Sequence, residues 1–403
     1  MKRNLLLLWI RDALNTGAAA LTSTSVLSAF FLRSGLSEGE IGFYLALTPF
    51  VNFVISLLFS GITGRVRNTL RAYSVTGFLT AAATLGFLFL CHENIPGGIF
   101  FFAVLLFGCL ISVFSAIKSI FDYKLPCELM DLSDYSVYVS VNGILGGVIG
   151  IVCAAILAQL YAVLPFYPVT AGAFLGAGLF LAAGSVLNGR LRVLHPAKTP
   201  EPQTAAEKPS GNRSAVRILF TDRDFLFLIL PNFVRGFGAG ALSLVSVIAA
   251  SACHMNESGL AFITVCTYLA TLVSCLFYTA LSRRFGATVT GVLGGIVFCL
   301  IIPCFAGGSL LFFVLYTLSY IGFNIMSCAV PESVYQYVPE DRVSAFHTWR
   351  LALTTLGTTL STAVFGKLLD RIPPVVLMVI GAVSVLVCVI GYQLCFRKRK
   401  KNE

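Results

Sequence analysis

The sequence carries little charge. Asp, Glu, Lys and Arg make up 11% of its 403 residues, whereas soluble domains carry roughly 25%. Hydrophobic residues account for 57% and the mean hydropathy is +0.88, which excludes a soluble globular protein. The apolar residues form long runs that do not alternate as barrel strands would. Because helices and closed barrels alone satisfy the backbone inside lipid, the sequence predicts an all-α membrane protein in a lipid bilayer.

The sequence also lacks the local motifs that mark many enzymes. It contains no phosphate-cradling glycine loop, no serine nucleophile elbow and no HExxH helix, so we expect neither an enzyme nor a cofactor. Its 12 cysteines lie mostly inside apolar runs without paired short spacings, which predicts neither disulfides nor zinc. Two fragments, 91–93 and 253–257, combine Cys, His and Glu without a chelating spacing, and we expect no metal site there.

Twelve apolar runs approach or exceed the roughly 20 residues that a helix needs to cross a bilayer. They cover residues 5–32, 41–60, 72–91, 99–120, 137–164, 169–187, 225–250, 260–281, 289–305, 310–330, 346–368 and 374–396. The first run follows Lys2 and Arg3 and is interrupted by Arg11 and Asp12. We therefore interpret it as the first membrane helix and not as a cleavable signal.

One long polar segment, residues 188–224, divides the runs into six and six. It is rich in basic residues and proline and cannot bury enough apolar surface to pack, so it predicts a water-facing linker. The predicted organisation is an N-terminal half (1–187), this linker, and a C-terminal half with a basic tail (225–403). The two halves are expected to be pseudo-symmetric, with six helices each.

Most of the 28 Lys and Arg residues fall in segments that lie inside the cell if the N-terminus is cytoplasmic. Because cytoplasmic loops are enriched in Lys and Arg, we predict that both termini and the linker are cytoplasmic, in the plasma membrane. The same pattern accounts for the net charge of +10 without nucleic-acid binding.

The two halves repeat two landmarks in the same order. The second span ends in a basic stretch at residues 61–67, and the eighth ends in another at residues 281–286. The fourth span leads to a Leu-Pro-Cys-Glu sequence ending at Glu128, and the tenth leads to a Val-Pro-Glu sequence ending at Glu332. This repetition indicates an internal duplication, which is common among transporter folds.

With this layout the chain resembles the major facilitator superfamily over its whole length. Residues 35–42 look like the segment that precedes the second helix in that family. In the loop that follows, Gly61 fits the family pattern and Arg65 stands where an Asp belongs, while the second copy keeps Arg284 and again has Arg283 for the Asp. The resemblance implies a monomeric secondary transporter that moves a small-molecule substrate by alternating access, coupled to H⁺ or Na⁺.

Ionisable residues inside a span are costly and usually face a cavity or a partner. In the family the first, fourth, seventh and tenth spans line the central cavity, so we expect Arg11 and Asn15 in the first span and Asn232 and Arg235 in the seventh to contact substrate. Guanidinium groups there favour a carboxylate or phosphate. Asp12 is the candidate for proton coupling. The alternative is that both arginines snorkel to the cytoplasmic surface, with Asp12 as a partner.

A second set of polar residues lies at helical spacing in the later spans. The tenth span places Tyr316, Tyr320 and Asn324 four residues apart, and we predict that they contact substrate. The eighth span carries a stripe of hydroxyl-bearing residues: Thr264, Thr267, Thr271, Ser274 and Tyr278. Hydrogen bonding between helices is the equally weighted alternative for both sets. Arg350, near the start of the eleventh span, is interpreted as a structural anchor at the cytoplasmic surface.

Basic and acidic clusters share the predicted cytoplasmic face, and we hypothesise that they pair to hold that face closed. The predicted gate residues are Arg65, Arg67, Arg71, Glu128, Arg283, Arg284 and Glu332. Exposed ion pairs contribute only about 0 to 1 kcal/mol each, so several would have to act together. Solvated loops that obey the charge rule are the alternative. For the whole chain, the alternative to a transporter is a receptor or scaffold that keeps the fold without transporting.

Overall fold

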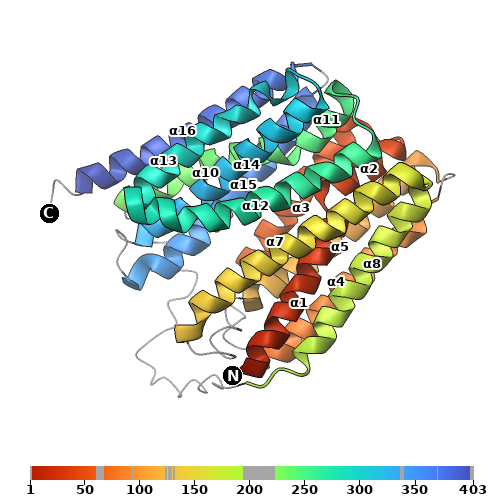
Figure 1. The fold of residues 1–403 in the computed structure, drawn as a ribbon, viewed down its shortest axis with the longest axis horizontal. Coiled ribbons are helices and arrows are strands. Elements are labelled where there is room, and N and C mark those ends of the chain that lie inside the picture. Colours follow the sequence, from red (N-terminus) through yellow and green to blue (C-terminus); the bar gives the residue numbers. More distant parts are fainter. Residues whose placement is uncertain are drawn as a thin grey trace.

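The computed structural model describes residues 2–59, 68–92, 95–122, 125, 129, 132–193, 223–335, 340–369 and 371–399. In these residues the regular structure is helical, and the helices lie side by side along one common direction (Figure 1). Both chain ends lie toward the same end of the molecule, at the lower left of Figure 1. The predicted all-α class is confirmed.

The helices before residue 194 match the first predicted runs. They are α1 (Lys2–Leu21), α2 (Thr24–Arg33), α3 (Glu38–Phe59), α4 (Thr69–Gly86) with its 3₁₀ extension η2 (Phe87–Leu90), α5 (Gly97–Asp122), α7 (Leu132–Val163) and α8 (Phe166–Asn188). Most of the predicted linker, residues 194–222, lies outside the described residues.

The helices after residue 222 follow the later predicted runs. They are α10 (Arg223–Ser243), α11 (Val245–Ala252), α12 (Glu257–Phe285), α13 (Ala287–Phe298) with η3 (Cys299–Ile301) and η4 (Pro303–Phe305), α14 (Ser309–Tyr335), α15 (Glu340–Leu368) and α16 (Pro374–Arg399). In the described part of the chain, 9 helices are long and apolar enough to cross a membrane. The molecule is therefore a multi-pass membrane protein.

The predicted first and seventh spans are each broken in two. Ser23 separates α1 from α2 in an extended conformation (φ −61°, ψ 158°), and its hydroxyl accepts a hydrogen bond from the amide of Val26. Serine favours such caps because its side chain competes with the helical backbone for the free amides. Leu244 separates α10 from α11 at a comparable point. Both breaks differ from the predicted continuous helices, and hydropathy alone does not show them.

Glycines bring helices from the two ends of the sequence into contact. A Cβ atom on Gly42 of α3 would lie 2.7 Å from the Cα of Gly366 of α15, so the two backbones touch. On α7, a Cβ on Gly150 would lie 2.4 Å from the Tyr268 ring of α12, and one on Gly147 would lie 3.2 Å from Leu272. The glycines of α7 thus form a packing surface for α12.

The largest buried cluster joins the N-terminal part (residues 2–193) to the C-terminal part (residues 223–399). It includes Phe30 and Phe31 of α2 together with Val247 and Ile248 of α11, all at most 1% exposed. Figure 1 places α2 and α11 at the end of the molecule opposite the chain termini. A smaller cluster, which includes Leu8, belongs to the N-terminal part alone. The described core thus ties the two parts together mainly at the end away from the termini.

Candidate functional site

A charged pair lies inside the N-terminal part, on α1. The Arg11 and Asp12 side chains are 4% and 12% exposed, and Nη2 of Arg11 lies 2.6 Å from Oδ1 of Asp12. The Nε atom of Arg11 donates to the same oxygen at 2.7 Å. The hydroxyl of Tyr138 on α7 donates to Oδ2 of Asp12. Both carboxylate oxygens of Asp12 therefore accept at least one hydrogen bond.

A second cation lies next to this pair. Lys118 of α5 donates to Oδ1 of Asn15 at 3.1 Å. Its ammonium lies 5.1 Å from the centre of the Tyr73 ring, and Cζ of Arg11 lies 5.0 Å from the same centre. Tyr73 is 2% exposed, so one buried aromatic ring contacts two cations through its negative face. The structure brings together three residues predicted as site residues on α1, namely Arg11, Asp12 and Asn15.

Lys118 was not predicted as a site residue, although it lies inside the predicted range 99–120 and inside the membrane span Gly97–Ser119. A lysine within an apolar run was the available signal, because intramembrane cations normally mark a functional or paired site.

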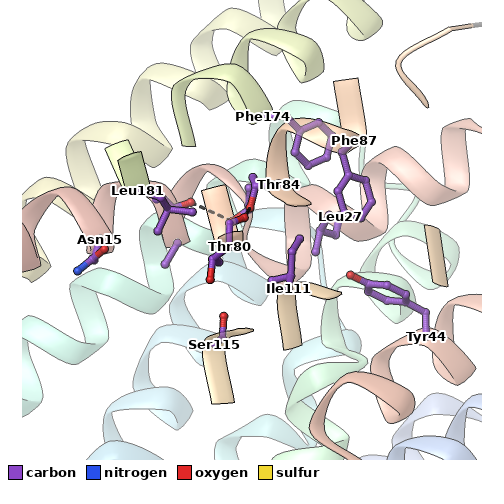
Figure 2. Close-up of a pocket in the computed structure, with 13 residues that line it drawn as sticks. Asn15, Leu27, Tyr44, Thr80, Thr84, Phe87, Ile111, Ser115, Phe174 and Leu181 are labelled. Carbon is purple, nitrogen blue, oxygen red and sulfur yellow. Dashed lines mark hydrogen bonds between the residues drawn. The ribbon is translucent and has the colours of Figure 1, made fainter. Parts of the chain in front are cut away.

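A cavity of about 190 Å³ lies beside this cluster, within the N-terminal part. Its wall comes from α1, α2, α3, α4, η2, α5 and α8. Figure 2 shows Asn15 and Tyr44 at opposite ends, and the hydroxyls of Thr80 and Ser115 pointing toward each other between them. The family resemblance placed the substrate between the two halves, whereas this cavity is lined by residues of the N-terminal part alone.

Two arginines occupy the corresponding region of the C-terminal part. Arg235 of α10 lies with Cζ 5.7 Å from the centre of the Phe323 ring of α14. Its Nε and Nη1 atoms are buried and form no hydrogen bond with any described residue, and the same is true of Nε of Arg350 on α15. The charge of Arg350 acts on Arg235, and close backbone contact between Gly236 and Gly357 holds the two helices together. Arg350 was interpreted as a surface anchor, but its buried Nε lies inside this part of the bundle.

Asn232, one turn before Arg235, is 0% exposed and donates to the hydroxyl of Tyr392 on α16. It therefore contributes to the packing of α10 against α16. A solute would have to displace Tyr392 to reach its amide nitrogen.

The polar residues of α12 and α14 bond mainly to each other. Tyr316 and Thr267 share a hydrogen bond of 3.0 Å, and Asn324 donates to Thr271 at 3.1 Å. Thr264 forms a 2.6 Å hydrogen bond to Ser23 in the break between α1 and α2. These contacts favour the helix-packing interpretation for Tyr316 and Asn324. Tyr320 has its ring 5.7 Å from that of Tyr316, and its hydroxyl has no hydrogen bond to the described residues.

Little of the predicted gate falls on described side chains. Arg65, Arg67 and Glu128 lie outside the described residues, as does the side chain of Glu332. Arg71 lies exposed near the start of α4, and Arg283 and Arg284 lie exposed in the last turn of α12. None of these three forms an ion pair with another described side chain.

Metal-ligating residues are dispersed in the described structure. No group of three or more His, Cys, Asp or Glu side chains that could hold a metal ion occurs among the residues it covers.

Comparisons with known proteins relate this architecture to solved structures. No family model matches the sequence, and no curated protein matches it. Among solved structures, a mutant form of the nucleoside transporter NupG aligns with a TM-score of 0.74 at 14% identity, over 98% of this chain and 100% of that one. A bacterial homologue of the iron transporter ferroportin, in an inward-facing state, aligns with a TM-score of 0.68 at 15% identity, over 98% and 99% of the two chains.

A bacterial homologue of the human lysosomal transporter Spinster, inward-facing and unoccupied, aligns with a TM-score of 0.65 at 13% identity, over 98% of this chain and 95% of that one. The likeness covers nearly the whole chain, and at these identities it shows a shared fold.

Proposed function

We propose that this chain, which has the major facilitator superfamily fold, is a secondary transporter that moves a small anionic solute by alternating access. In this proposal twelve membrane helices form two six-helix halves, residues 1–187 and 225–403, joined by a linker at 188–224. The paired breaks after α1 and α10 support the repeat, because related halves would carry a broken helix at the same position. The protein would act as a monomer.

The preference for an anion rests on one observation, the burial of Arg235 donors that have no hydrogen-bond partner among the described residues. A guanidinium keeps its charge at any physiological pH, and burying its donors without partners is costly. Two of its nitrogens are buried without a hydrogen-bond partner among the described residues, and a second arginine with a buried unpartnered Nε lies nearby. A carboxylate or phosphate would satisfy these donors and relieve the repulsion between the two cations. We therefore assign the anion contact to Arg235 and add Arg350 to it.

We infer that the structure corresponds to an inward-facing state in the plasma membrane. The buried cluster around Phe30 and Ile248 joins the two parts at the end away from the termini, and the charge pattern favours cytoplasmic termini. The closed end would then be external and the cytoplasmic end open. In this state the basic residues Arg71, Arg283 and Arg284 would be apart from their acidic partners.

Asp12 is proposed to couple transport to protons. Arg11 and Tyr138 both donate to its carboxylate, so protonation of Asp12 would release Arg11 for another anion. Binding of a proton to Asp12 would thus favour binding of an anion to Arg11, and this positive coupling between the two is what a symporter needs. The same contacts leave Asp12 little capacity to ligate Na⁺, which favours H⁺ as the coupling ion.

A screen followed by a transport assay tests the proposal. Carboxylates and phosphates are first ranked by thermal stabilisation of the purified protein, since a bound ligand raises the midpoint. The best ligand is then labelled, and its accumulation in proteoliposomes is measured under an imposed pH gradient. We expect accumulation above the external concentration that a protonophore abolishes. Binding without accumulation under any gradient would instead support the receptor or scaffold alternative.

The proposed gate pairs Arg65, Arg67, Arg71, Arg283 and Arg284 with Glu128 and Glu332 when the cytoplasmic end closes. Cysteine pairs placed across that end should crosslink less efficiently once Glu128 and Glu332 are changed to Gln. Crosslinking yields that ignore both changes would show that the charges are only solvated loop residues.

A further inference from the structure

The cavity in the N-terminal part combines polar groups at separate points with an apolar wall. Asn15 and Ser115 lie toward one end and Tyr44 lies at the other (Figure 2). The hydroxyls of Thr80 and Thr84 donate to carbonyls of their own helix, at 2.8 Å and 2.9 Å, and have no donor left. Leu27, Ile111, Phe87 and Phe174 complete the wall.

Two of the polar groups have no hydrogen-bond partner among the described residues. Neither the hydroxyl of Ser115 nor that of Tyr44 forms a hydrogen bond with another described residue, and both residues line the cavity. Tyr44 is held by the rest of its ring, which packs edge to face against Phe31 at 4.8 Å and fits over Gly108, where a Cβ would come within 2.4 Å of it. The ring of Tyr44 is thus fixed by packing, while its hydroxyl has no partner among the described residues. Because a buried tyrosine hydroxyl usually forms a hydrogen bond, we expect a polar group of a ligand to bind it.

The Ser115 end is also positively charged. Lys118 lies three residues later on α5, on the same face of that helix, and its ammonium donates to the cavity-lining Asn15. Arg11 lies over the Tyr73 ring that also faces Lys118, but its charge is balanced by Asp12, so the excess positive charge at this end is that of Lys118. A negative group at this end of the cavity would therefore be attracted by Lys118 and could accept a hydrogen bond from Ser115.

The size and shape of the cavity limit the remainder of the ligand. Its volume is about 190 Å³, and an apolar cavity of about 150 Å³ holds benzene. Phe87 and Phe174 form part of the wall as a stacked pair, with centroids 5.0 Å apart and planes at 21°. One six-membered ring with a carboxylate and a small substituent fills this space, and the aromatic wall favours a planar ring.

We propose that this cavity is a binding site for a small aromatic monocarboxylate, with its carboxylate at Ser115 beside Lys118 and its ring against Phe87 and Ile111. A hydroxyl on the far side of the ring bonds to Tyr44. The site lies within one half of the fold and is distinct from the Arg235 region. The inference rests on the proposed function only in taking the occupant to be a solute, and its test requires binding and not transport.

Titration calorimetry of the purified full chain with benzoate, 4-hydroxybenzoate and benzyl alcohol tests the site. We expect one benzoate per chain, at least tenfold weaker binding of the neutral benzyl alcohol, and tighter binding of 4-hydroxybenzoate. Ser115→Leu fills the polar end and should weaken benzoate at least tenfold. Ser384→Leu, a matched change at a half-buried position on α16 outside the cavity, should leave the affinity unchanged.

Tyr44→Phe gives a second readout that does not depend on filling the cavity. It should weaken 4-hydroxybenzoate about three- to tenfold, the effect of one lost hydrogen bond, and leave benzoate within twofold. Tyr167→Phe, at a half-buried position in α8 outside the cavity, should change neither. Lys118→Gln should remove the preference for benzoate over benzyl alcohol.

Three results would overturn the proposal. One is the absence of saturable benzoate binding to the folded wild-type protein. Another is full benzoate affinity in folded Ser115→Leu protein together with its loss in Arg235→Gln, which would place the acid in the other half. The third is equal weakening of both acids by Tyr44→Phe. Failure of transport in proteoliposomes with these affinities intact would count against the proposed function and not against this site.

Discussion

The hydroxyl of Tyr138 donates a hydrogen bond to one carboxylate oxygen of Asp12, while Arg11 binds the other. This relationship links α7 to α1 through the one acid that lies with a cation inside the first span. It gives the proposed coupling residue a defined partner on each oxygen. A change at Asp12 should therefore affect proton coupling and leave the binding of solute in place.

Asp12→Asn should abolish accumulation driven by a pH gradient and preserve exchange of labelled for unlabelled solute across the membrane. The amide cannot take up a proton in this range, but it keeps the shape of the side chain and a carbonyl that still accepts from Tyr138 or Arg11. Uptake and exchange are measured in the same proteoliposomes. Gradient-driven accumulation that persists with its pH dependence intact would remove Asp12 from the coupling role.

Gly42→Val should destabilise the inward-facing state. A Cβ on Gly42 would lie 2.7 Å from the backbone of Gly366, so α3 and α15 must separate at this point. Overpacking of this kind costs about 1–3 kcal/mol, and we expect a lower thermal midpoint and slower uptake. Gly39→Ala on the same helix meets nothing within 4 Å and serves as the control. An unchanged thermal midpoint in Gly42→Val would show that the close contact between α3 and α15 does not contribute to stability.

Tyr392→Phe should lower the free energy of unfolding and leave solute affinity unchanged. The change removes the Tyr392 hydroxyl that accepts from the amide of Asn232, a residue that is 0% exposed, and the loss of one hydrogen bond costs about 0.5–1.5 kcal/mol. Chemical denaturation in detergent gives the stability and calorimetry gives the affinity. A large loss of solute affinity without a loss of stability would instead support the prediction that Asn232 contacts substrate.

Hydropathy and charge were sufficient to predict the helices, because a membrane span must be long, apolar and internally hydrogen bonded. The break at Ser23 could not be predicted in this way, because one serine inside an apolar run changes the hydropathy very little. Its hydrogen bond to Thr264 depends on a helix more than 200 residues away.

In the candidate sites, single charged residues could be recognised from the sequence, whereas their contacts with other helices could not. Arg11, Asp12 and Arg235 stood out from the sequence because charge inside a span is rare. Tyr138, the partner of Asp12, did not, because tyrosine is common in apolar runs. Arg350 stood out as well, but its place near a predicted helix end favoured the interpretation as a surface anchor. The cavity between Ser115 and Tyr44 is formed by the packing of several helices, and no spacing along one helix reveals it.

The affinity of Arg235→Gln for the transported anion tests the central claim most directly. The substitution removes the charge and keeps polar contact, and Arg371→Gln at an exposed position after α15 is the matched control. Binding of the anion identified by the stabilisation screen is measured by calorimetry in both variants. The account predicts that Arg235→Gln weakens binding at least tenfold, as expected for a charge-assisted hydrogen bond, and that Arg371→Gln leaves it within twofold. Equal affinities in the two folded variants would contradict the assignment of the anion contact to Arg235.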